Sequence, residues 1–463
     1  MSSRAIGAFV DQLADAGIEC HSIMVMRHGR VIAEGWWAPY AAERPHLLYS
    51  MTKTITALGV GIAIGDGVLA LEDRIIDLLP RHVPEVLGEQ AQRLTVEHLL
   101  TMTTGVDEDA LGDSWTREPG DLVKGFLGSA FVHREGTVFA YDNAAAFVLA
   151  RMVEAVTGED FAHYLNARLL HPMGIRDAEW DRVASGRVFG FHGLHLTTEA
   201  VAAIGELLRL DGVWEGARLL PAGWVGRATR AHVDSRHYVT GEPGPDFHRG
   251  YGYQTWVGSE GFHANGAFGQ HLLVIPERAL VVALTCGQTE VRHAQDALNA
   301  VWECLLPGVE RTDSEKDDRV LAARLGRCAL PGVAGERRAD VAVSASVVDV
   351  DVADSAVEAG RFVSLSVDGA GWMLRIDGIG EVEIGFGVWA ESAPTGRPVC
   401  AMGAWQSDAF VAHLYVVTSP HRVDLMVDPR TGTATLRWHT VPLTTSDLAL
   451  HLRHPLMTRP DVS

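Results

Sequence analysis

The chain has 463 residues, of which 47% are hydrophobic and 21% charged, and its 39 basic and 59 acidic residues give a formal net charge of −20. This length predicts two or three domains. The acidic balance and the scattered Lys and Arg residues argue against a nucleic-acid partner and against an anionic membrane surface, because both require a basic patch.

The N-terminal segment 1–22 is predicted to be an amphipathic helix, and it lacks the uninterrupted apolar core of a signal peptide. No later stretch is long and apolar enough to span a membrane. The five cysteines are scattered, odd in number and without metal-ligand spacing, a pattern typical of reduced thiols. We therefore expect a cytoplasmic protein. Residues 22–36 form two apolar runs around His28-Gly29, which predicts a hairpin.

An apolar helix is predicted to begin directly after Ser50, with Lys53 in its first turn. Lysine is rare in this chain, and the other two are Lys124 and Lys316. Residues three apart lie on one face of a helix. Burial and the positive end of the helix dipole both lower a lysine pKa, and a neutral amine can take the proton of a serine hydroxyl. The pattern predicts a nucleophile and its base, with the Ser50 N–H as half of an oxyanion hole. A chance Ser-x-x-Lys match is the alternative.

A second group of polar residues is Tyr141-Asp142-Asn143, in front of a strong helix pattern at 144–156 that Gly158 closes. In an extended backbone the side chains of Tyr141 and Asn143 point the same way. A phenol near an amine can share its proton, and an amide can hold both the lysine and a substrate carbonyl. In the alternative, Tyr141 is a core aromatic residue and Asn143 a helix cap.

A third feature is the run HANGAFGQ at 263–270, which places two glycines in a predicted strand. Glycine inside a strand is typical of a close backbone approach. A substrate along this edge could hydrogen-bond to backbone groups, with one N–H completing the oxyanion hole. A structural bulge explains the same residues.

The other elements of the first 308 residues are helices and short apolar strands. The strand-like runs come from both ends of this segment, which predicts a mainly antiparallel sheet flanked by helices, an α/β (α+β) fold. The further helices are predicted at 95–105 after Thr95, at 197–210 after Thr197 or Thr198, and at 291–304.

The pattern changes after residue 308. Residues 309–338 are polar and charged, which predicts a linker with one short helix around 315–326. From 339 to 463 the helical periodicity gives way to short alternating strands and tight turns. We therefore expect three parts: a catalytic domain at 1–308, the linker, and an all-β domain at 339–463 that forms an antiparallel, lipocalin-like barrel or a sandwich.

The order of these motifs, Ser-x-x-Lys, then Tyr-x-Asn, then a Gly-containing strand, resembles that of the penicillin-recognising serine hydrolases. This family includes class C β-lactamases, DD-peptidases, D-aminopeptidases, and related esterases and amidases. The resemblance covers about residues 5–305, and LTVEHLLTMTTG at 94–105 and LLPAGWV at 219–225 add to it. It implies the β-lactamase/penicillin-binding-protein-like fold.

The resemblance also implies a role for each motif. Ser50 is the nucleophile, Lys53 and Tyr141 share the general base and acid work, and Asn143 orders the network and contacts the substrate. The N–H groups of Ser50 and Ala267 form the oxyanion hole. The substrate-binding residues of the strand would be His263, Asn265, Gly266 and Ala267.

One departure from the family pattern narrows the substrates. The strand motif commonly begins with Lys or His, and here the matching residue is Ala264. A lysine at that position commonly binds the carboxylate of a β-lactam or peptide terminus, so its absence argues against such substrates. His263 is one residue early and by strand alternation faces the other way, unless a bulge reverses it.

These observations predict a serine hydrolase that acts through an acyl-enzyme on esters, small amides or peptides and is not primarily a β-lactam-resistance enzyme. The alternative within the same chemistry is a penicillin-binding-protein-type thioesterase or acyltransferase, which would take a peptidyl group, including one bound to a carrier protein. An alternative of another class is a non-catalytic ligand sensor on the same fold. Histidine pairs such as His192/His195 lack a third ligand at usable spacing. We expect no metal and no organic cofactor.

Overall fold

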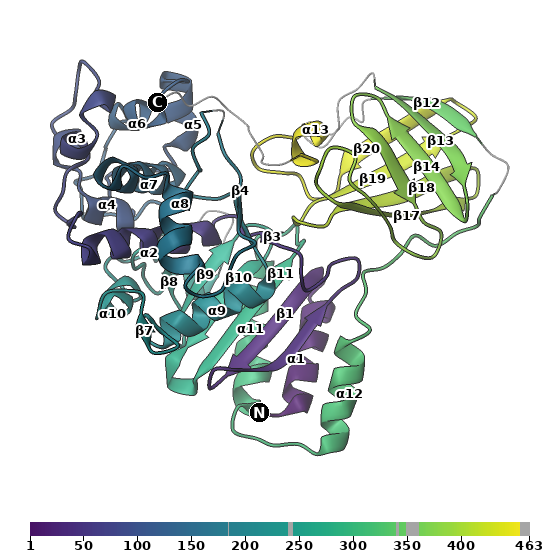
Figure 1. Ribbon diagram of the computed structural model, residues 1–463, viewed down its shortest axis with the longest axis horizontal. Helices are drawn as coiled ribbons and strands as arrows, with labels where there is room; N and C mark the ends of the chain where they lie inside the picture. The colour runs from purple at the N-terminus through teal and green to yellow at the C-terminus, as the bar shows by residue number, and fades with distance from the viewer. Residues whose placement is uncertain (184, 239–243, 339–341, 349–360, 454–463) are drawn as a thin grey trace.

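A six-stranded antiparallel sheet lies at the centre of the first part of the chain, within the residues that the computed structural model describes: 1–183, 185–238, 244–338, 342–348 and 361–453 (Figure 1). The predicted assembly of strands from both ends of this segment is confirmed. The hairpin at its edge is also confirmed, and both turn residues have positive φ, His28 at 50° and Gly29 at 74°. The strands run in the order β2 (Arg30–Trp36), β1 (Cys20–Arg27), β11 (Leu280–Cys286), β10 (Gln270–Ile275), β9 (Phe262–Gly266) and β8 (Trp256–Val257).

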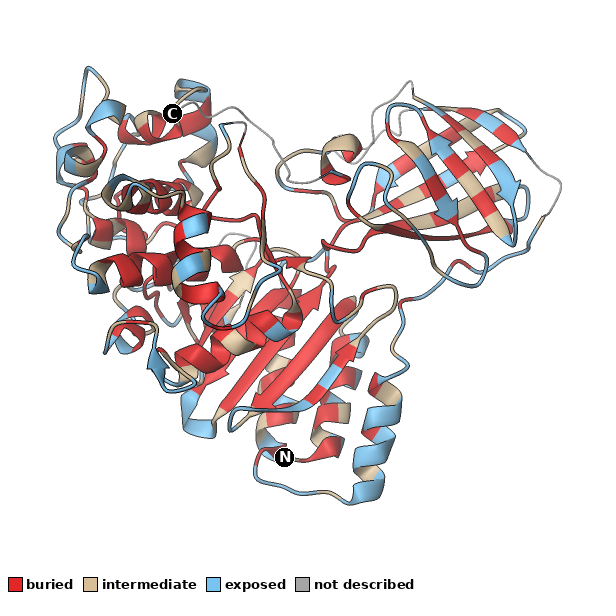
Figure 2. Cartoon of the chain, viewed as in Figure 1, coloured by how far each residue is buried: buried red, intermediate tan, exposed pale blue. Residues whose placement is uncertain are grey.

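The two faces of this sheet bury alternate residues of each strand, as the period of two requires. Ile23 and Val25 pack into one hydrophobic cluster together with α1 (Ser3–Asp15) and α11 (His293–Ala300). Met24 and Met26 pack into the other cluster, which contains α9 (Thr198–Arg209). The sheet is therefore buried on both sides, as its colour in Figure 2 shows.

The helices around α2 (Met51–Gly65) form the second layer. The predicted helix after Ser50 is confirmed, and its residues from Met51 to Ala63 are buried. The predicted helix before Gly158 is confirmed as α7 (Asn143–Thr157), which ends with Gly158 at φ 69°. The other helices of this layer are α3 (Ile75–Leu78), α4 (Val96–Leu100), α5 (Leu111–Arg117), α6 (Leu122–Leu127), α8 (Phe161–Leu165) and α10 (Trp224–Ala228).

Two helix ends differ from the predictions. Thr95 caps α4 as expected, but the helix ends at Leu100 instead of continuing to residue 105, because Met102 turns the backbone into the left-handed region at φ 53°. Helix α11 gives way at Val301 to a π-helical turn, so the predicted helix at 291–304 is divided. Thr197, one of the two predicted caps, accepts the hydrogen bond from Ala200 N at the start of α9.

The polar segment after residue 308 contains α12 (Glu315–Leu325), close to the predicted helix. This helix packs on α1 and β2 (Figure 1), where Leu321 and Leu325 are buried. Arg324 donates to Asp11 at 2.6 Å, which holds α12 against α1. The polar segment therefore includes a helix that is docked on α1 through both apolar and charged side chains.

In the described residues from 343 to 438, nine strands form a nearly closed sheet, called the C-terminal sheet below. The sheet comes close to closure where Gly385, directly after β15, pairs with Met402 of β17. Neighbouring strands in the sheet follow the order β15 (Gly380–Ile384), β14 (Gly371–Ile376), β13 (Phe362–Asp368), β12 (Val343–Val347), β20 (Thr433–Trp438), β19 (Arg422–Asp428), β18 (Ala409–Val416), β17 (Val399–Gln406) and β16 (Ala390–Ser392). The all-β prediction is thus confirmed for these strands, whereas the rest of the predicted domain at 339–463 includes residues outside the described ranges.

The alternating pattern predicts strands at 361–369, 372–380, 381–389, 410–418, 422–428 and 433–441, so β12, β16 and β17 are absent from the prediction. Strand β17 is the most instructive, because its residues from Val399 to Trp405 are all buried. A strand buried on both faces has no alternating pattern for the sequence to display.

The C-terminal sheet is attached to the first part of the chain by buried polar contacts. Arg397 donates to Asp181 Oδ1 at 2.5 Å, and His195 lies 3.0 Å from Asp181 Oδ2. The turn between β18 and β19 holds the segment in front of α2, because Leu47 N donates to Thr418 O at 2.9 Å. This turn therefore helps to position the backbone segment that leads to Ser50.

In the part of the chain that the structure describes, no helix has the length and apolar character required to cross a bilayer.

Candidate active site

Ser50 and Lys53 lie together at the start of α2, where Ser50 is the residue before the first helical turn. Lys53 Nζ is 2.9 Å from Ser50 Oγ, which is hydrogen-bonding distance. Lys53 is only 1% exposed, although a lysine is almost never fully buried without a partner. Such burial of a lysine side chain is typical of a functional site.

The surroundings of the Lys53 amine favour its neutral form. Besides Ser50 Oγ, its acceptors are Asn143 Oδ1 at 2.6 Å and Phe191 O at 3.2 Å, and both are uncharged. Burial lowers the pKa of Lys53 to about 7, against an opposing effect of the nearby Asp109 and Asp142 carboxyl groups. A neutral amine has two N–H donors, which the amide and carbonyl oxygens can take, and one lone pair that remains for the serine proton.

Asn143 is the first residue of α7, and its amide joins Lys53 to an acidic residue that the sequence interpretation missed. Asn143 Nδ2 donates to Asp109 Oδ2 at 2.5 Å, and Asn143 N donates to Asp109 Oδ1 at 3.0 Å. Asp142 is the helix cap, since its Oδ1 accepts from Ala144 N at 2.9 Å. Asn143 is therefore free of the capping role and has a fixed amide orientation.

Tyr141 lies close enough to the Ser50 hydroxyl for the two groups to interact, and this interaction acts against the effect of burial on the pKa of the phenol. Its ring centroid is 4.8 Å from Lys53 Nζ, and its other side is stacked on Trp256 at 5.9 Å. Burial, with the nearby Tyr238, raises the pKa of Tyr141 well above its ordinary value, so the phenol keeps its proton near neutral pH. Tyr141 is thus arranged as a hydrogen-bond donor.

Strand β9 carries the predicted substrate-binding residues, and it lies against the backbone in front of Ser50. A Cβ on Gly266 would come within 2.1 Å of Leu48 O, so only glycine permits this approach. Asn265 turns toward its neighbouring strand, where its Nδ2 donates to Gln270 O at 3.4 Å. Ala267 follows the strand in a turn and its carbonyl accepts from Gln270 Nε2 at 3.1 Å.

The side chain of His263, near the start of β9, is fully buried. Its ring lies edge-on to Phe247 at 5.0 Å, and its Nε2 is 3.4 Å from Asp246 O. Burial lowers the pKa of His263 to about 4. Ala264, at the position of the missing cation, is buried and paired with Leu272.

A cavity of about 300 Å³ opens at Ser50. Its apolar walls include Leu111, Trp115 and Phe191, and its polar side includes Asn143 and Asp109. Leu443 and Thr444, which follow β20, complete the cavity from the C-terminal sheet. The sequence carries no signal for this contribution, because these residues are almost four hundred positions from Ser50.

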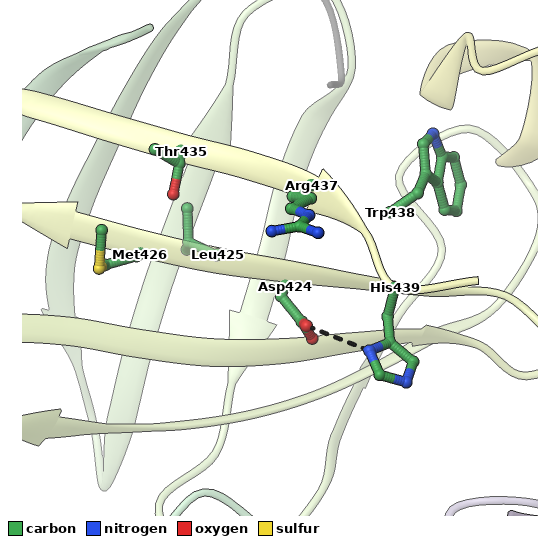
Figure 3. Close-up of a pocket in the computed structure, with 7 residues that line it drawn as sticks. All are labelled: Asp424, Leu425, Met426, Thr435, Arg437, Trp438 and His439. Atoms are coloured by element: carbon green, nitrogen blue, oxygen red, sulfur yellow. Dashed lines mark ion pairs between the residues drawn. The ribbon is translucent and has the colours of Figure 1, made fainter. Parts of the chain in front are cut away.

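A separate hollow lies on β19 and β20 of the C-terminal sheet (Figure 3). Asp424 forms an ion pair with His439 there at 3.6 Å, and Arg437 is drawn beside them. Its described lining residues include neither Ser nor Cys. The pairing of a hydroxyl with a buried amine is therefore a feature of the cavity at Ser50.

The fold is that of the β-lactamase- and penicillin-binding-protein-like class. The Beta-lactamase family model matches residues 6–302, more than half of the chain, and the protein belongs to that family. The match ends before the C-terminal sheet, so the family assignment rests on the first part of the chain.

Two curated relatives are hydrolases. A 6-aminohexanoate-dimer hydrolase from Paenarthrobacter ureafaciens is 28% identical over 221 residues, which cover 44% of this chain and 55% of the relative. The esterase EstB from Burkholderia gladioli is 27% identical over 201 residues, 38% of this chain and 51% of the relative. The chain thus spans about half the length of these relatives.

One solved structure resembles the chain well beyond the family-model range. The octameric penicillin-binding protein homologue from Pyrococcus abyssi has a TM-score of 0.51 and 15% identity, and the match covers 94% of this chain and 99% of that one. At this identity the likeness is one of fold.

Proposed function

We propose that the protein is a serine hydrolase that cleaves esters or small amides through an acyl-enzyme on Ser50. The observation that carries the proposal is the 2.9 Å contact between Ser50 Oγ and the buried Lys53 amine, whose pKa burial lowers to about 7. An amine with this pKa is both available as a base and able to return the proton near neutral pH. The family membership supports hydrolase chemistry.

The proposed reaction begins when Lys53 Nζ takes the proton of Ser50 Oγ and the oxygen attacks the substrate carbonyl carbon. The N–H groups of Ser50 and Ala267 stabilise the resulting oxyanion, an assignment that the approach of β9 to Leu48 supports. When the tetrahedral intermediate collapses, the bond to the leaving group breaks and the proton passes to that group from Lys53, with Tyr141 donating a hydrogen bond. Water then attacks the acyl-enzyme and releases the carboxylic acid.

The proposed substrates are uncharged at the position where family members commonly bind a carboxylate. Ala264 offers no cation there, and His263 packs against Phe247. Both relatives reported above are hydrolases by name, one an esterase and one acting on the dimer of 6-aminohexanoate, which favours an ester or a small amide. The proposal therefore predicts that an activated ester is a better substrate than a β-lactam.

Acyl transfer is the second candidate function. The penicillin-binding-protein-type thioesterases also combine this catalytic fold with a C-terminal β domain, and the nearly closed C-terminal sheet favours the comparison. In that case an amine, from the same chain or another molecule, would replace water as the acceptor. A cyclic product from a peptidyl thioester would identify this activity. The cytoplasmic location stays a prediction from the sequence.

The test is labelling of the protein with a fluorophosphonate, followed by intact-mass analysis and by turnover of activated esters. The expected result is one adduct, located on Ser50, and ester turnover that Ser50→Ala abolishes. Equal turnover by Ser50→Ala, or no adduct on Ser50, would overturn the proposal and favour the non-catalytic sensor. Nitrocefin is expected to be hydrolysed with a lower kcat/KM than the best ester.

A further inference from the structure

The segment after β20, residues 439–446, reaches from the C-terminal sheet to the cavity at Ser50; we call it the β20 loop. Leu443 and Thr444 of this loop line the cavity together with Ser50. Leu443 is 67% exposed, so a large apolar side chain stands at the cavity rim with most of its surface in water. A ligand that covered this surface would gain hydrophobic free energy.

The β20 loop is held in place from both ends. Trp438 Nε1 donates to Ser446 O at 2.8 Å, and His451 Nε2 lies 2.6 Å from Thr445 O. Thr440 Oγ1 donates to Pro420 O at 2.8 Å, which ties the loop to the turn before β19. The wall at Leu443 is therefore a defined surface and is pre-organised for contact.

The loop is also connected to the residue directly before the nucleophile. The Tyr49 hydroxyl lies 2.6 Å from His421 Nε2. Burial raises the pKa of this phenol, and the backbone of Leu443 acts against that effect, so the loop is within electrostatic reach of Tyr49. Tyr49 has φ 50°, a left-handed conformation that is uncommon for a residue with a side chain. The C-terminal sheet thus contacts both the cavity rim and the backbone that presents Ser50.

The chemistry of the cavity indicates what the wall would contact. Besides the β20 loop, the cavity is lined by the apolar side chains of Leu111, Trp115 and Phe191. Among the described residues that line it, none is Arg or Lys, and the carboxylate is that of Asp109. An anionic acyl group would be repelled there, whereas an uncharged chain would lie between apolar surfaces.

We propose that Leu443 is a specificity-determining residue and that the β20 loop forms the distal wall of the acyl site. It selects uncharged acyl groups with an apolar chain long enough to reach the rim. This inference rests on the proposed function, since it describes the acyl group that Ser50 accepts. It gives the C-terminal sheet a direct part in substrate choice.

The test measures kcat/KM for p-nitrophenyl acetate, butyrate, hexanoate and octanoate with the full chain. Leu443→Ala is expected to lower the hexanoate-to-acetate ratio about 10-fold, because one or two lost methylene contacts change kcat/KM by about that factor. Leu443→Asp is expected to lower this ratio further, because a carboxylate at the rim disfavours an apolar chain. Val388→Asp is the matched control, because Val388 is 64% exposed in the bend between β15 and β16 and is not part of the cavity lining.

The outcomes separate this inference from the proposed function. The acyl-chain profile could stay unchanged in both Leu443 variants while the fluorophosphonate still labels Ser50. That result would overturn the proposed role of Leu443 and leave the proposed hydrolase function standing. An equal loss in Val388→Asp would assign the effect to the sheet as a whole and would also overturn the role of Leu443. No label on Ser50 and no turnover in the unmodified chain would overturn both.

Discussion

Lys53 and Arg397 are both buried cationic side chains, 1% and 3% exposed, and their surroundings give them different properties. The acceptors in contact with Lys53 are a hydroxyl, an amide and a carbonyl oxygen, all uncharged. Arg397 contacts the Asp181 carboxylate directly at 2.5 Å. A buried amine without a contacting anion loses its proton readily, whereas a guanidinium stays charged when buried and is here paired with a carboxylate.

The two sites show that the surroundings of a buried cation decide whether it can serve as a base or as a structural contact. At Lys53 the nearest carboxyl groups, Asp109 and Asp142, act only from a distance, so burial dominates and lowers its pKa to about 7. At the second site His195 and Arg397 outweigh burial and lower the pKa of Asp181. The first arrangement leaves a proton that can move, and the second joins the C-terminal sheet to the first part of the chain.

The largest expected effect is on Lys53. Lys53→Arg places a permanently charged group at the position of the base, and Lys53→Met removes the base with little change in volume. We expect each to lower kcat for an activated ester by about 10³-fold, within the range of a lost general base. Steady-state kinetics measure this, with thermal unfolding as a check of the fold.

Lys124→Arg is the matched control, because Lys124 pairs with Glu118 at 2.9 Å and its side chain is 35% exposed. It is expected to keep full activity. If Lys53→Met retained more than a tenth of the wild-type kcat, the assignment of Lys53 as the base would be wrong.

The next effect is on the buried pair at the sheet attachment. Arg397→Met removes the cation that contacts the buried Asp181 carboxylate, and breaking such a pair typically costs about 3–5 kcal/mol. Urea unfolding followed by tryptophan fluorescence should show the loss as a lower midpoint. Arg430→Met breaks an exposed pair with Asp428 and is expected to cost less than about 1 kcal/mol. Equal midpoints for the two variants would contradict the structural role of Arg397.

Much of the first part of the fold follows from local patterns. The hairpin at His28-Gly29, the apolar helix after Ser50 and the helix that ends at Gly158 are each specified by adjacent residues. The rarity of lysine in the sequence is enough to mark Lys53 as a candidate base. Such features depend on neighbours in sequence, and sequence analysis finds them for that reason.

The remaining features depend on contacts between distant segments. Asp109 is one of several acidic residues in its loop, and only the fold brings it to Asn143. Tyr49 and Leu443 come close together across almost the whole chain. Strand β17 was missed because full burial removes the alternation that marks a strand. No periodicity encodes any of these three.

The pH dependence tests the Lys53 side of the comparison directly. Because the reaction needs the neutral amine, kcat/KM for an uncharged ester should fall as the pH drops below about 7, by about 10-fold per pH unit, and reach a plateau above it. Burial lowers the pKa of His192, which also lines the cavity, to about 3, so its titration falls outside this range. A profile that is flat from pH 5.5 to 8.5 would contradict the proposed base.

The smallest expected effect is that of Asp109→Asn. Asp109 is a positioning residue, because it acts on the reaction through Asn143 and Lys53. Asp109 accepts two hydrogen bonds from Asn143, and its negative charge raises the pKa of Lys53. The variant should lower kcat about 3- to 10-fold through the weakened hold on Asn143. It should also move the acid limb to lower pH, because removing the negative charge lowers the pKa of Lys53 further. A merely structural defect would lower the rate and leave the limb in place, and Asp107→Asn, at a 77% exposed side chain in the same loop, supplies the control for loop effects. A limb that stayed near pH 7 in Asp109→Asn would show that the charge of Asp109 does not affect the pKa of Lys53, which would then be set by burial and by Asp142.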